Sequence, residues 1–154
     1  MIMARELSMG ESREAAGFRS ELIAATSKAE SHIDSFLGKL RNIKKDGPSG
    51  ITAEMKVGGV FGLGGTNLRI AMRIEKGNLL GDILHPKLGD KKVTFQISQG
   101  ILNHGFEQGI NPESKAAKTA KQAIFAGELQ EISKRFRDQY KTTGKVSGGG
   151  SDGT

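Results

Sequence analysis

Apolar residues in the first third of the chain recur every three or four positions. The pattern covers residues 18–43, with charged side chains between its members. The apolar members are Phe18, Leu22, Ala25, Ala29, Ile33, Phe36, Leu37 and Leu40. This spacing places them on one side of a helix, and the Gly- and Pro-containing run 46–50 ends the pattern because both residues disfavour helix continuation. The sequence therefore predicts one amphipathic N-terminal helix.

The hydrophobic period then changes from a helical one to two residues. Three alternating runs, 51–57, 68–74 and 93–97, each have one apolar and one polar side. The apolar face that we expect to be buried consists of Met55, Leu68, Ile70, Met72, Val93, Phe95 and Ile97. Strands of this kind are typical of an antiparallel sheet covered on one side. We predict a sheet of three strands or slightly more, with a partly irregular connection at residues 77–91.

A second helical pattern occupies the C-terminal part of the chain. Asn111 and Pro112 are a typical N-cap and first helical residue, and Glu113 suits the positive end of a helix dipole. We predict one long helix over residues 112–141, and an α+β fold class. Residues 1–146 should form a single domain with a flexible arm at 1–12, and the Gly/Ser-rich stretch 147–154 should be a flexible tail.

Composition limits the classes of protein that remain. With 154 residues and 36% apolar residues, the chain has material for one modest core. Its net charge of +6 favours an anionic partner. The absence of cysteine excludes disulfides and thiolate chemistry. No apolar run reaches the about 20 residues needed to cross a bilayer, and no secretory signal is seen. We therefore expect no membrane partner and a cytoplasmic location, or a virion-associated one after cytoplasmic assembly.

Catalytic chemistry has little support in the sequence. The histidines are His32, His85 and His104, and none has a second ligand at a spacing typical of a metal site. No serine lies in a nucleophile-elbow pattern. We interpret the histidines as structural or surface residues. The chain is predicted to be no enzyme, with no catalytic, metal-binding or cofactor-binding residue.

A glycine-rich segment at residues 61–71 reads Phe-Gly-Leu-Gly-Gly-Thr-Asn-Leu-Arg-Ile-Ala. It resembles the first phosphate motif of the hexokinase and glucokinase family. The resemblance implies contact between a nucleotide phosphate and the turn of Gly64, Gly65 and Thr66. However, the aspartate of that family falls on Gly62, and 154 residues are too few for its two lobes. Paired glycines also supply the positive φ of a hairpin turn, so we prefer a hairpin and keep nucleotide binding as a third alternative.

The tip of this hairpin is a candidate for contact between subunits. With 22 glycines and 5% aromatic residues, the chain has little side-chain volume with which to stabilise an isolated monomer. The predicted assembly contacts are Gly58, Gly59, Val60, Phe61 and Leu63. The leading hypothesis is a non-catalytic structural or assembly protein, a small homo-oligomeric subunit of a viral or bacterial macromolecular complex.

A row of lysines gives the alternative hypothesis. Lys115, Lys118 and Lys121 recur every three residues and share one side of the predicted last helix. Residues 113–123 resemble the start of the final helix in double-stranded-RNA-binding domains, and the order of helix, three strands and helix is also similar. The resemblance implies phosphate contacts without sequence readout. The alternative is thus a nucleic-acid-binding accessory protein that uses these lysines with Arg69 and Arg73 on the polar sheet face.

Overall fold

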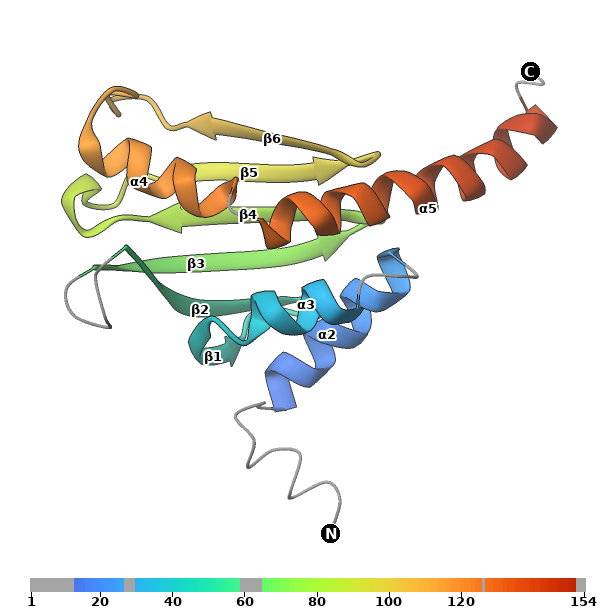
Figure 1. The fold of residues 1–154 in the computed structure, drawn as a ribbon, viewed down its shortest axis with the longest axis horizontal. Coiled ribbons are helices and arrows are strands. Elements are labelled where there is room, and N and C mark those ends of the chain that lie inside the picture. Colours follow the sequence, from blue (N-terminus) through green and yellow to red (C-terminus); the bar gives the residue numbers. More distant parts are fainter. Residues whose placement is uncertain (1–12, 27–29, 59–64, 126, 152–154) are drawn as a thin grey trace, which may run out of the picture.

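The computed structural model describes residues 13–26, 30–58, 65–125 and 127–151. Its centre is a six-stranded antiparallel sheet in which every strand pairs with the next one along the chain (Figure 1). The strands are β1 (Leu40–Lys45), β2 (Gly50–Val57), β3 (Thr66–Glu75), β4 (Asn78–Leu84), β5 (Val93–Ser98) and β6 (Ile101–Phe106). The sheet is therefore a meander whose outer strands are β1 and β6.

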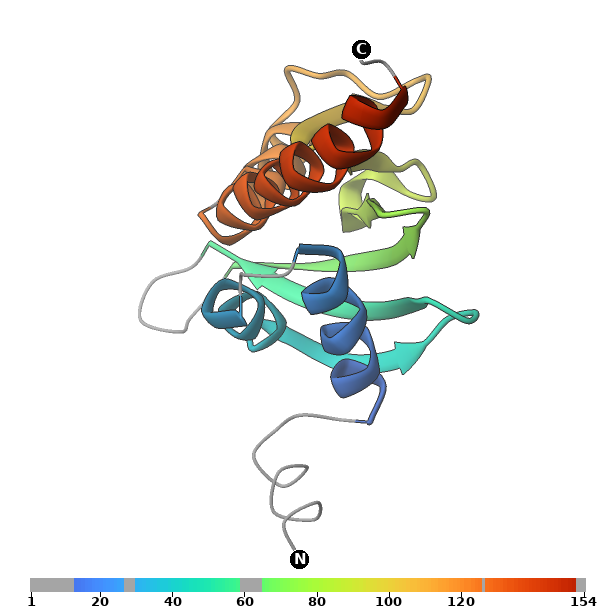
Figure 2. The same ribbon diagram turned by 90° about the vertical axis from the view of Figure 1, so that its right-hand side faces the viewer.

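The helices lie on one face of this sheet (Figures 1 and 2). They are α2 (Arg13–Thr26), α3 (Glu30–Leu37), α4 (Lys115–Ile124) and α5 (Glu128–Ser151), and a short 3₁₀ turn, η1 (Pro86–Leu88), follows β4. Helix α2 packs on β1 and β2, whereas α4 and α5 pack on β5 and β6. Helix α5 also contacts α2 and α3. The N-terminal helices α2 and α3 thus pack against the C-terminal helix α5 on the covered face of the sheet (Figure 1).

The core lies between the sheet and the helices. All seven residues of the predicted apolar face are buried there, which confirms the face that the alternation predicted. The helix side of the same core is formed by buried residues of α2 and α3, which are Phe18, Leu22, Ile33 and Phe36. We call the other side of the sheet the open face. It is formed by the side chains that alternate with the buried ones, and these include Arg41, Glu54, Arg69, Arg73, Thr94, Gln96, Ile101 and Asn103.

The fold class α+β and the antiparallel sheet agree with the sequence, but the detailed architecture predicted from it is wrong. The sheet has six strands instead of three. The predicted helix 18–43 is two helices followed by β1, and the predicted helix 112–141 is the two helices α4 and α5. The single-domain boundary at 146 stays a prediction. The arm 1–12 lies outside the described residues, and α5 continues into the predicted tail as far as Ser151.

The missed strands have identifiable physical causes. Leu40 is buried at the start of β1, so its spacing from the helical residues was compatible with either element. In β4 the alternation is interrupted by Gly81, where an added Cβ would overlap the ring of Phe95 on β5. Glycine here lets a neighbouring strand's aromatic ring cross the backbone. In β6 the inward positions include His104, which weakens the apolar period.

Candidate functional site

Among the residues that the structure describes, no three His, Cys, Asp or Glu side chains are grouped closely enough to hold a metal ion. His85 is buried, and its Nδ1 accepts the backbone N–H of Lys87 at 3.0 Å. Burial, followed by the charge of Lys87, lowers its pKa. His104 lies edge-on to two phenylalanine rings, and burial followed by the charge of Lys121 lowers its pKa as well. Both imidazoles therefore favour the neutral form and pack as structural residues.

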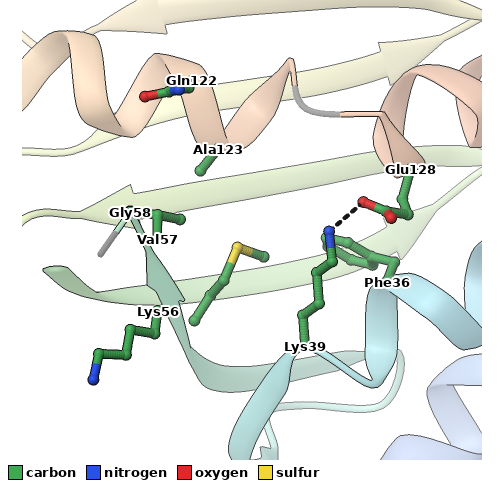
Figure 3. Close-up of a pocket in the computed structure, with 9 residues that line it drawn as sticks. Phe36, Lys39, Lys56, Val57, Gly58, Gln122, Ala123 and Glu128 are labelled. Carbon is green, nitrogen blue, oxygen red and sulfur yellow. Dashed lines mark hydrogen bonds and ion pairs between the residues drawn. The ribbon is translucent and has the colours of Figure 1, made fainter. Parts of the chain in front are cut away.

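A cavity of 370 Å³ opens where α3, α4 and α5 meet the end of β2 (Figure 3). Its walls include the apolar side chains of Phe36, Met55 and Ala123. At its rim, Lys39 Nζ donates to Glu128 Oε1 at 2.7 Å, and this bond is the main cause of the lowered pKa of Glu128. The ion pair connects α5 to the turn between α3 and β1. The arrangement offers a charged pair over an apolar wall, without a nucleophile beside it among the lining residues.

The end of β2 and Gly58, where the glycine-rich connection begins, line this cavity. Strands β2 and β3 pair antiparallel up to Val57 and Thr66, so the segment connects two neighbouring strands as the hairpin prediction requires. Gly58 and Gly65 have φ angles of 76° and 85°, which favour glycine. The other predicted assembly contacts, at positions 59, 60, 61 and 63, lie outside the described residues. Their role in assembly stays a prediction, as does that of Gly58.

The predicted nucleic-acid-binding residues do not form one surface. Lys115, Lys118 and Lys121 are exposed on α4, which packs on the helix-covered side of the sheet. Arg69 and Arg73 are exposed on the open face, on the other side. Lysines and arginines that were combined on the basis of sequence are therefore separated by the thickness of the sheet.

Two lysines that the sequence analysis did not select lie near the start of α4. Lys87 on η1 and Lys91 before β5 line a depression of 340 Å³ together with Lys115. These side chains come from segments that are far apart along the chain. No spacing pattern could have joined them, because the connection 77–91 was expected to be irregular.

The two outer strands are the remaining candidate surface. On β1, Arg41, Lys44 and Lys45 are exposed, and the pairing with β2 shifts between Arg41 and Lys44. On β6, all six residues pair with β5 in continuous register. None of those six residues is charged or is proline, and Ile101 is 54% exposed. Strand β6 therefore presents a regular, uncharged edge.

The β6 edge is held in place from the helix side. Gly100, in the turn before β6, has a φ of 81°, and an added Cβ would overlap the backbone of Arg137 on α5. Its carbonyl oxygen accepts the hydroxyl of buried Ser133 at 2.8 Å and the guanidinium of Arg137 at 3.3 Å. The close approach fixes the start of β6 against α5, so the edge is a rigid surface.

No helix in the described part of the chain combines the length and the apolar content needed to cross a bilayer. Comparisons with models of protein families, with curated proteins and with solved structures find no match for this chain. The candidate functional surfaces are therefore the two outer strands, the cavity and the lysine-lined depression.

Proposed function

We propose that this chain is a non-catalytic structural or assembly protein, a small subunit that associates with copies of itself within a larger viral or bacterial complex. The observation that supports it best is the bare outer edge of β6. The proposal keeps the cytoplasmic location predicted from the sequence, or a virion-associated one after cytoplasmic assembly. It assigns no cofactor and no catalytic residue.

An outer strand offers unpaired backbone N–H and C=O groups, which act as a template for another strand. Within the described residues, no further strand pairs with β6. A second copy related by a two-fold axis perpendicular to the sheet would place its own β6 antiparallel to the first. Because side chains alternate between faces, residues of the same face must lie opposite each other. Two registers meet this condition near the strand centre: Asn103 or His104 lies opposite its own counterpart.

Electrostatics favours β6 over β1 for this contact. Pairing two β6 edges brings no charged strand residue near another. Pairing two β1 edges would bring together two sets of Arg41, Lys44 and Lys45, and opposed like charges destabilise strand pairs. Association through β6 would also cover the exposed side chain of Ile101.

The test is the double variant Ile101→Lys with Asn103→Lys. Both side chains are exposed on the open face, so their replacement should leave the core intact. In the Asn103 register the new lysines at position 103 lie directly opposite each other. In the His104 register they lie on the diagonal, which long side chains still reach, so the added charge should weaken pairing in both registers. We expect the native chain to form an oligomer whose melting temperature rises with protein concentration, and the variant to be monomeric by sedimentation.

The matched control is Thr94→Lys with Gln96→Lys. It adds the same charge to the same face, but on β5, which already has neighbours on both sides. The control should keep the native mass. As a comparison, Arg41→Thr with Lys44→Thr removes charge from β1 and should leave the mass unchanged or raise it. A native chain that is monomeric at every concentration, or a β6 variant with native mass, would refute the proposal.

A further inference from the structure

The depression at the start of α4 concentrates positive charge. It is lined by Lys87, Lys91 and Lys115, and the other lining residues are Leu88, Gly109, Ile110, Asn111, Ser114 and Ala116. No carboxylate is among them. Three ammonium groups around one concave surface raise the local positive potential, and an anion placed there would relieve their mutual repulsion.

Local backbone structure fixes the position of each of these three lysines. Lys87 lies in η1, whose first turn is held by the hydrogen bond from its N–H to His85. Lys91 crosses the backbone of Gly109, where an added Cβ would lie 2.6 Å from Nζ and 3.0 Å from Cε of the lysine. Gly109 has a φ of 96°, so its conformation and its missing side chain both admit the lysine. Lys115 is the first residue of α4, directly after the Ser114 cap.

Two carboxylates near the depression, Glu113 and Glu107, have other partners. Glu113 pairs with Lys118 at 3.3 Å, and Glu107 accepts the backbone N–H of Lys92 at 2.8 Å. Within the described part of the chain, no carboxylate oxygen lies within 4.0 Å of the ammonium groups of Lys87, Lys91 or Lys115. The positive charge of the depression is therefore available to an external anion.

We propose that the depression binds a backbone phosphate of a double-stranded nucleic acid, and that Lys118 and Lys121 extend the contact along α4. Lys121 lies six residues after Lys115, which corresponds to about 9 Å of helix axis, so the basic surface is longer than one phosphate group. No aromatic residue lines the depression. Without an aromatic platform for base stacking, contact is limited to phosphates and carries no sequence information. This activity goes beyond assembly and uses a different surface from β6.

The experiment compares two double variants with equal changes in charge. Lys87→Gln with Lys91→Gln removes two cations from the depression, whereas Arg69→Gln with Arg73→Gln removes two from the open face. Binding of a duplex RNA and a duplex DNA is measured at several salt concentrations. For the Lys87/Lys91 variant, the slope of log affinity against log salt concentration should be smaller by about the contribution of two phosphate contacts, irrespective of sequence. The Arg69/Arg73 variant should keep the native slope.

A second measurement separates a nucleic acid from a small phosphate. In NMR titrations at constant ionic strength, duplex should shift the backbone amides of Lys115 and Ala116, and the Lys87/Lys91 variant should lose these shifts. Saturation of the same amides by inorganic phosphate without any binding of duplex would overturn the proposed partner. Equal slopes for the two double variants, or no binding of duplex by the native protein, would also overturn it. Binding by the monomeric Ile101/Asn103 variant would show that the result does not depend on assembly.

Discussion

The two outer strands of the sheet present different surfaces to a possible partner. Strand β1 has three exposed basic residues and an irregular register with β2, and Asn42 within that irregularity has a φ of 53°. Strand β6 pairs with β5 at every residue and has no charge. Basic side chains and bulges are common means by which proteins prevent edge-to-edge pairing. Within the described residues, β1 has both features and β6 has neither.

The same difference is seen in the turns that lead to these edges. Gly47 lies between β1 and β2 with a φ of 74°, and nothing lies within 4 Å of the position of a Cβ. Gly100 lies between β5 and β6 and is in close contact with α5. Gly47 thus has open space beside it, whereas Gly100 is packed against α5. Stability measurements at the two turns can therefore test whether β6 is the rigid edge.

Gly100→Ala should have the largest effect. The new Cβ meets the Arg137 backbone, which cannot move without shifting α5, and the positive φ adds strain. We expect a loss of about 2–4 kcal/mol in the free energy of unfolding. Gly47→Ala should cost only about 1 kcal/mol, because strain at positive φ is its only penalty. Urea denaturation of both variants gives the comparison, and equal losses would show that the β6 turn is not packed as described.

Ser133→Ala tests the polar part of the same contact. The buried hydroxyl donates to the Gly100 carbonyl at 2.8 Å, and Arg137 still reaches that oxygen in the variant. We expect a loss of about 1 kcal/mol. At the other edge, Asn42 Nδ2 donates to Glu54 in an exposed position. Asn42→Gly keeps the tolerance of positive φ and should change stability by less than about 0.5 kcal/mol. A larger loss at Asn42 than at Ser133 would reverse the ranking of the edges.

The smallest of these effects should come from acid. Lowering the pH should reduce the free energy of unfolding through His104 on β6. The pKa of His104 is lowered by burial and then by Lys121, so the unfolded chain takes up the proton first. The contribution of the neutral imidazole to the free energy of unfolding is therefore fully present above the usual histidine pKa of about 6.5, and it decreases as the pH falls below that value. His85 adds a decrease of the same sign. His104→Gln should make the loss of stability between pH 7 and pH 5 shallower, as measured by denaturation at each pH. An unchanged pH profile would remove His104 from this role.

The parts of the fold that the sequence predicted are those with regular side-chain periods. Strands β2, β3 and β5 alternate, and the seven residues assigned to their apolar face are all buried. Strand β4 was missed because Gly81 stands where an apolar side chain would complete the pattern. The C-terminal helix was predicted as one element because Phe125 and Leu129 are four residues apart and so keep a helical spacing across the boundary between α4 and α5.

The candidate surfaces were harder to predict from the sequence than the buried strands. Lys115 was selected from its spacing along α4, whereas Lys87 and Lys91 join it only because η1 and the loop before β5 fold back to the helix start. Arg69 was assigned to the same surface because sequence does not show which side of the sheet α4 covers. The bare edge of β6 was equally hidden, since a strand becomes an edge only when the whole sheet order is known.

The meander has a consequence for the order in which the chain folds. Each strand contacts the preceding and following strands, so the sheet can grow one hairpin at a time and every step closes a short loop. The hydrogen bonds from Ser35 and Lys39 to Glu128 join residues 93 and 89 positions apart. Closing that distance early would cost much chain entropy, whereas a completed sheet already fixes the separation between its outer strands β1 and β6, which follow α3 and precede α4 and α5. Formation of the hairpins before the helix contacts is therefore the route with the smaller entropic barrier.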